Sequence, residues 1–143
     1  MKIERMKISD LDQIMAIEKI SFLIPWEKSF FEYDLRRKQG YCYVVKENEK
    51  VIGYTDAWHV ADEVHLANIA VTPSYRHAGI GSKMLAKIIE DARKISCHKI
   101  YLEVRLSNLI AQKFYEKFGF EAIYTRVKYY PDGEDAIVYE KRL

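Results

Sequence analysis

The sequence has 143 residues, 49% apolar and 31% charged, a composition that excludes a disordered chain and fits one domain over residues 1–143. Its formal net charge is +2, from 23 basic and 21 acidic residues without a long basic run, and gives no indication of a nucleic-acid partner. No apolar run is long enough to cross a bilayer and the N-terminus lacks a signal-peptide core, so we expect a cytoplasmic protein without a membrane partner.

In chain order, the apolar spacing predicts a strand, two helices, three strands, a helix, a strand, a helix and two final strands. The helices are expected at residues 10–21, 27–38, 79–95 and 108–118. The strands are expected at residues 2–8, 41–46, 51–60, 64–72, 99–105, 120–130 and 135–141. Asp10 begins the first helix, because a short polar side chain accepts hydrogen bonds from its free N–H groups. Pro25 separates the first two helices, and Gly40 ends the second.

The order βααβββαβαββ decides the expected fold class. The strand at 64–72, the helix at 79–95 and the strand at 99–105 form a βαβ unit, which implies a parallel pair with a right-handed crossover. The other strands are expected to pair antiparallel. We therefore expect an α/β protein with a mixed sheet and helices on both faces.

A glycine-rich turn, Arg76-His77-Ala78-Gly79-Ile80-Gly81, lies between the third hairpin strand and the long helix. Its two glycines let the backbone turn sharply, and the helix N-terminus and Arg76 add positive charge that suits a pyrophosphate. The turn is not a Walker loop, because GxxxxGK[ST] is absent, and it is not a dinucleotide fingerprint, because Met84 replaces the third glycine. A turn that binds nothing is the remaining alternative.

Metal chemistry has no support in the sequence. Cys42 and Cys97 have neither CxxC spacing nor a histidine partner, so we expect free thiols and no metal site. His59 and His65 flank the third hairpin, and a position facing the cleft is one alternative for them. We expect them in the core or on the surface rather than in a metal site.

The turn and its flanks resemble the motifs of the GNAT superfamily of N-acetyltransferases. Asn68-Ile69-Ala70-Val71-Thr72-Pro73 precedes the R-x-x-G-x-G turn, and Phe114-Tyr115-Glu116-Lys117-Phe118-Gly119-Phe120 resembles the second motif of that family. The element order is similar from end to end. The resemblance implies that acetyl-CoA is the cosubstrate. It assigns to coenzyme A the residues Ile69, Ala70, Val71, Arg76, His77, Ala78, Gly79, Ile80, Gly81, Ser82 and Asn108.

In that superfamily the strand before the turn parts from its neighbour, and its open edge pairs with the pantetheine amides. The resemblance gives this role to residues 69–71, with a backbone N–H near Val71 polarising the thioester carbonyl. Ile69 and Val71 are equally typical of a buried central strand. Both descriptions hold if the side chains pack in the core while the backbone binds coenzyme A.

Two residues have the chemistry that acetyl transfer to an amine requires. Glu103 alternates with Leu102 and Val104, so it lies on a polar strand face that is either solvated or open to a cleft. Tyr115 is either a core aromatic residue or a proton donor, because a phenol with a pKa of ~10 stays protonated at neutral pH.

The ribosomal-protein-alanine N-acetyltransferases (RimI type) have motifs that resemble Leu102-Glu103-Val104-Arg105, Ser107-Asn108, Ala111 and Phe114-Tyr115 of this sequence. Residues 129–136 resemble their C-terminal segment. The resemblance makes Glu103 the general base, Tyr115 the general acid and Asn108 a contact of coenzyme A. Asn108 also stands where a helix N-cap is expected. Trp26 and Tyr130 are candidates for the walls of the acceptor groove, although Trp26 could equally pack against the second helix.

The expected acceptor is the N-terminal α-amine of a protein, in particular alanine of a small-subunit ribosomal protein. An α-amine with a pKa of about 7.7–8.0 loses its proton at pH 7 for roughly 1.3 kcal/mol, against about 4.6 kcal/mol for lysine. Two alternatives stay open: an acetyltransferase of lysine or small-molecule amines, and a coenzyme A-binding regulatory protein. The sequence carries no signal for the oligomeric state.

Overall fold

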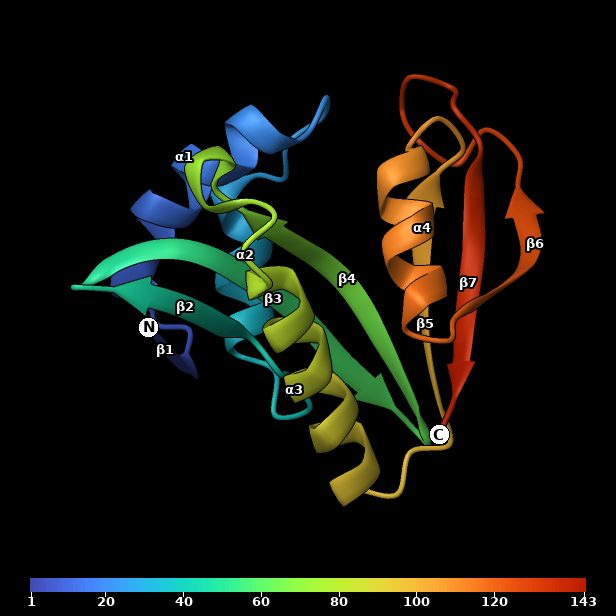
Figure 1. Cartoon of the computed structure of the whole chain (residues 1–143), viewed down its shortest axis with the longest axis horizontal. Coiled ribbons are helices and arrows are strands. Elements are labelled where there is room, and N and C mark those ends of the chain that lie inside the picture. Colours follow the sequence, from blue (N-terminus) through green and yellow to red (C-terminus); the bar gives the residue numbers. More distant parts are fainter.

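The computed structural model describes residues 1–143 and contains one seven-stranded sheet with strand order β1-β2-β3-β4-β5-β7-β6 (Figure 1). The strands are β1 (Lys2–Arg5), β2 (Tyr43–Glu47), β3 (Lys50–Val60), β4 (Glu63–Val71), β5 (Lys99–Arg105), β6 (Glu121–Arg126) and β7 (Ala136–Arg142). The helices are α1 (Leu11–Ser21), α2 (Lys28–Leu35), α3 (Ile80–Lys94) and α4 (Leu109–Lys117). The predicted order of elements and the mixed sheet are confirmed.

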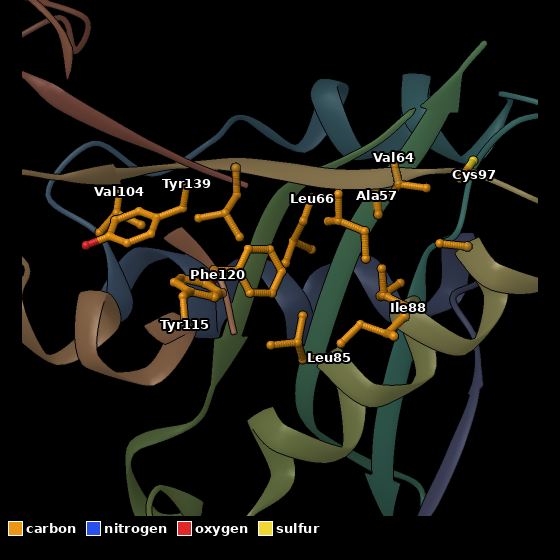
Figure 2. Packing of buried hydrophobic residues seen from close by; sticks show 14 of the residues in the cluster. Ala57, Val64, Leu66, Leu85, Ile88, Cys97, Val104, Tyr115, Phe120 and Tyr139 are labelled. Carbon is orange, nitrogen blue, oxygen red and sulfur yellow. The ribbon is translucent and has the colours of Figure 1, made fainter. Parts of the chain in front are cut away.

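Adjacent strand residues point to opposite faces of the sheet, and each face carries its own helices. Val44 packs with α1 and α2, whereas its neighbour Val45 packs with α3. Helix α3 buries Leu85 and Ile88 at helical spacing, and Figure 2 shows both side chains pointing toward Leu66 and Ala57 of the sheet. Helices on both faces were predicted and are confirmed. No helix combines the length and the apolar character needed to span a membrane.

Two predicted helix boundaries have a different physical basis from the one expected. Helix α1 begins after Asp10, but this buried carboxylate does not cap it. Asp10 instead accepts a hydrogen bond from the Lys7 N–H at 2.9 Å and pairs with the Lys46 ammonium at 2.9 Å. The prediction that Gly40 ends the second helix is wrong. Helix α2 ends at Leu35, and Gly40 forms a β-bridge with Trp58.

The parallel pair β4–β5 is short, and this determines where the molecule opens. Pairing covers three residues of each strand, with His65 opposite Tyr101 as the last pair. Beyond it the two strands diverge like the arms of a V, which Figure 1 shows between the green β4 and the pale orange β5. On its other edge β4 stays paired with β3 as far as Val71, with Ala67 as an extra, unpaired residue. Such a bulge bends and twists a strand, which carries β4 away from β5.

Leu85 anchors the core beneath the sheet and has no exposed surface. We predict that Leu85→Ala lowers the free energy of unfolding by about 2–5 kcal/mol, because it removes buried methyl groups and leaves a cavity. The control is Ile110→Ala on α4. Ile110 is 78% exposed, so this substitution should change the free energy of unfolding by less than about 0.5 kcal/mol. Urea unfolding of both variants measures this. Equal losses would contradict the assignment of Leu85 to the core.

Candidate active site

A cleft of about 670 Å³ lies where β4 and β5 diverge. Its walls come from the α1–α2 loop, both strands, α4 and the β6–β7 loop. Six candidates from the sequence line it together: Trp26, Ile69, Glu103, Asn108, Tyr115 and Tyr130. A second hollow of about 630 Å³, between α3 and Phe118, is shallower and contains none of them. The cleft between the strands is therefore the candidate active site.

The open edge of β4 offers unpaired backbone groups beside this cleft. The Thr72 N–H donates to the Ile52 carbonyl of β3 at 2.8 Å. Because consecutive residues of a strand direct their N–H groups to opposite edges, Val71 and Ile69 direct theirs away from β3. Strand β5 has already diverged at this level, so an extended ligand with amide groups can pair with this edge.

The glycine-rich turn has the geometry of an anion cradle. Gly79 has φ +82°, the left-handed conformation that favours glycine, and an added Cβ would meet no atom within 4 Å. The first hydrogen bond of α3 runs from the Lys83 N–H to the Gly79 carbonyl at 3.1 Å. The N–H groups of residues 80–82 therefore have no partner within the helix, and they lie at its positive end. His77 and Ala78 are exposed beside them.

Arg76 links the turn to the rest of the site. Its Nε donates to the Val71 carbonyl at 2.9 Å, and a terminal nitrogen donates to the Ser21 hydroxyl at 3.2 Å. These bonds tie the turn to the end of β4 and to the end of α1. They keep the positive charge of Arg76 at the turn.

Glu103 lies on the face of β5 that opens on the cleft, and its side chain is 10% exposed. Its Oε1 atom is 2.8 Å from Nε2 of His65, across the divergence of the two strands. The Tyr129 hydroxyl makes a longer contact with the same oxygen, at 3.5 Å. Of the two possibilities left by the sequence, a solvated face and a cleft-facing side chain, the structure has the second.

Tyr115 projects from α4 into the base of the cleft, where it packs edge-on against Phe120 (Figure 2). Only 6% of the residue is exposed, and burial raises the pKa of its phenol above the ordinary value of 10.0. Its hydroxyl makes no hydrogen bond to another protein group. The ring of Tyr115 is thus part of the core, while its hydroxyl remains available as a hydrogen-bond donor.

The two aromatic candidates for the acceptor groove, Trp26 and Tyr130, lie on different halves of the sheet and both line the cleft. Trp26 packs against Phe31 of α2, with ring centroids 5.2 Å apart, and also lines the cleft, so its contact with an acceptor stays a prediction. Its backbone N–H donates to Glu18 at 2.9 Å. Tyr130 forms the opposite wall, and burial raises its pKa to about 12.

Arg105 holds the Tyr130 wall in place. Its guanidinium lies 4.1 Å from the centre of the Tyr130 ring and pairs with Glu134 at 2.8 Å and Asp132 at 2.9 Å. Hydrogen bonds from Ser107 and Arg105 lower the pKa of Glu134 to about 2, so its carboxylate stays ionised. Strand β5 and the β6–β7 loop are thereby joined at the mouth of the cleft.

Asn108 has the capping role considered for it in the sequence. It is the N-cap of α4, and its Oδ1 accepts the Ala111 N–H at 3.1 Å. It also lines the cleft, so its contact with coenzyme A stays a prediction.

Sequence reasoning missed two features of the site, and the first is the hydrogen-bonded carboxylate of Glu18. Glu18 is a buried carboxylate that accepts hydrogen bonds from Tyr54 at 2.5 Å and Asn68 at 2.9 Å, in addition to the Trp26 N–H. The signal for Glu18 was a charged residue on the apolar stripe of α1. The second is the contact of His65 with Glu103: His65 faces the cleft, which was the alternative to the expected core or surface position.

Known proteins provide an independent comparison. The model of the acetyltransferase (GNAT) family matches residues 11–120. The [ribosomal protein bS18]-alanine N-acetyltransferases of Haemophilus ducreyi and Escherichia coli K12 are both 34% identical to this chain. Each alignment covers 95% of it, and 96% and 93% of the two relatives. The crystal structure of the ribosomal-protein-S18-alanine N-acetyltransferase from Escherichia coli superposes with a TM-score of 0.90 at 32% identity. That superposition covers 99% of this chain and 92% of the other.

The left-handed turn at Gly79 supplies a prediction about cofactor affinity. Gly79→Val should weaken coenzyme A binding at least tenfold, because a side chain in this conformation costs roughly 1–2 kcal/mol and fills the cradle. Gly133→Val is the matched control. Gly133 is likewise left-handed, with φ +89°, and has open space around it, but it lies in the β6–β7 loop. Calorimetric titration with coenzyme A measures both. Equal affinity of the two variants would contradict the location of the cradle.

Proposed function

The chain belongs to the acetyltransferase (GNAT) family, whose members use acetyl-CoA, and we propose that it acetylates the N-terminal α-amine of a protein. The proposed acceptor is the N-terminal alanine of a small-subunit ribosomal protein, as in the names of its relatives, and the proposed location is the cytoplasm. One observation carries the proposal: a carboxylate and a buried phenol face the same cleft between an open strand edge and two aromatic walls.

The proposed cofactor site is the turn together with the open edge of β4. Three free N–H groups at the start of α3 suit a pyrophosphate, and the edge of β4 suits the amides of a pantetheine arm. This fit rests on the left-handed Gly79 and on the divergence of β5, both of which leave backbone groups without protein partners. Acetyl-CoA would supply its acetyl group as a thioester. No metal is part of the proposal.

Glu103 is the proposed general base. An α-ammonium group must lose a proton before it can attack, and at pH 7 this costs only about 1.3 kcal/mol. A carboxylate acting through water is a weak base, so it suits an α-amine better than a lysine. Glu103 lies on the cleft-facing side of β5 with one oxygen already engaged, which fixes its orientation.

Tyr115 is the proposed general acid. Its raised pKa keeps the phenol protonated at neutral pH, and the lack of a protein partner leaves its O–H free to donate. A thiolate leaving group is the recipient that this chemistry requires. Tyr115 lies on α4 and Glu103 lies on β5, and both line the cleft. The proposed acid and the proposed base therefore come from different elements of one site.

Trp26 and Tyr130 are the proposed walls for the first residues of the acceptor. Glu18 positions the first through its backbone, and Arg105 positions the second through its ring. An open cleft between two loops admits the end of an extended chain.

The catalytic pair is tested by two conservative substitutions. Glu103→Gln and Tyr115→Phe should each lower kcat at least 100-fold, because general acid–base catalysis contributes about 10²–10⁴-fold. Both should keep coenzyme A affinity within twofold, since binding needs neither group. Steady-state acetylation and calorimetry separate the two effects. Unchanged turnover in both variants would remove the assignment.

The acceptor is tested with small-subunit ribosomal proteins incubated with the enzyme and acetyl-CoA. We expect mass spectrometry to find a 42-dalton gain, the mass of an added acetyl group, at an N-terminal alanine, and peptides with a blocked N-terminus to stay unmodified. A panel of peptides, lysine side chains and polyamines supplies the comparison. Preference for a polyamine or a lysine over every N-terminal peptide would favour the alternative acceptor class. Coenzyme A binding without any transfer would favour a regulatory protein.

A further inference from the structure

His65 occupies the last position at which β4 and β5 are paired. Its Cα partner on β5 is Tyr101, and the next cleft-facing residue on that strand is Glu103. Backbone pairing between the strands stops here, yet the side chains of His65 and Glu103 remain joined at 2.8 Å. This contact bridges the two strands at the apex of the cleft.

The imidazole of His65 is held on both sides by aromatic rings. It stacks on Tyr101 with centroids 4.6 Å apart and planes 12° apart, and it meets Trp58 edge-on at 4.9 Å. Both neighbours are its partners in the sheet register, one on β5 and one on β3. The ring therefore has a fixed direction, and its Nε2 points at the carboxylate.

We propose that His65 is a positioning residue for acetyl transfer, which holds the Glu103 carboxylate in its working orientation. This inference rests on the proposed function of Glu103 as the base. A glutamate side chain loses considerable rotamer freedom when it is fixed, and a base that is fixed in advance need not lose it during the reaction. His65 is 16% exposed and Glu103 10% exposed, so little water competes for this hydrogen bond.

The contact also decides which oxygen of Glu103 serves the reaction. An ionised carboxylate only accepts hydrogen bonds, so the proton of the contact sits on Nε2 of His65. Both His65 and Tyr129 contact Oε1. Oε2 is left to accept the proton of the amine, directly or through water. The imidazole directs the base without taking part in the proton transfer itself.

The kinetic test is a double-mutant cycle of His65→Leu and Glu103→Gln, run on the amine that the enzyme acetylates fastest. Alone, His65→Leu should lower kcat at least tenfold and leave the KM for acetyl-CoA within twofold. In the Glu103→Gln background it should lower kcat less than twofold further, because the group it positions is gone. His65→Gln should recover kcat to within about threefold of wild type, since its amide N–H replaces the imidazole donor.

His59→Leu is the matched control. His59 is a half-buried histidine of the same hairpin, held at 2.8 Å from the Tyr41 hydroxyl, and it does not line the cleft. Its loss should change kcat less than twofold. A spectroscopic readout is independent of turnover: nitrogen-15 NMR should find the proton of the neutral His65 imidazole on Nε2 in wild type. That preference should be lost in Glu103→Leu.

The outcomes distinguish this proposal from the proposed function. Loss of activity in Glu103→Gln without loss in His65→Leu overturns the role of His65 alone. So does a full further loss from His65→Leu in the Glu103→Gln background, or an Nδ1-protonated ring in wild type. Full activity of Glu103→Gln overturns the base together with its positioning residue. Acetylation of an acceptor other than an N-terminal amine overturns the proposed acceptor and leaves the cycle intact.

Discussion

The separation of β4 from β5 after three residue pairs is the constraint on which the rest of the molecule depends. A central strand normally satisfies its backbone groups on both edges, and an unpaired edge inside a protein is costly unless another partner takes its place. Here the open edge borders a cleft that reaches the surface. The bulge at Ala67 bends β4 away, and the core beneath, with Leu66 and Leu85, still holds the two strands over the same helices.

Each half of the divided sheet carries its own part of the site. The β1–β4 half carries the Trp26 wall through Glu18, whose carboxylate receives three hydrogen bonds and is 1% exposed. Because all of its donors are in place, this buried charge is tolerated, and losing any one of them would leave it poorly compensated. The β5–β7 half carries Glu103 and, through Arg105, the Tyr130 wall. The cleft therefore lies between two groups of strands that are joined to each other by only three residue pairs.

Local patterns in the sequence were sufficient for the fold and for much of the site. Alternation placed Glu103 on the face of β5 opposite Leu102, and the spacing of α3 placed its apolar stripe on the sheet. The contact of His65 with Glu103 was out of reach because it depends on the register of a short parallel pair between strands 38 residues apart. The end of α2 was misjudged for a similar reason, since Gly40 is held by a bridge to Trp58 rather than by the helix.

The V formed by β4 and β5 also connects the packing of the core with the shape of the cleft. Its apex is the pair of His65 and Tyr101, and the cleft that opens from it is lined by Trp26 of the α1–α2 loop and Tyr130 of the β6–β7 loop. The width of the cleft between these rings depends on the angle at which the two strands diverge. Phe120, which packs in the core with Leu66 and does not line the cleft, therefore supports this angle from below. The shape of the cleft is thus a consequence of core packing as well as of the residues that line it.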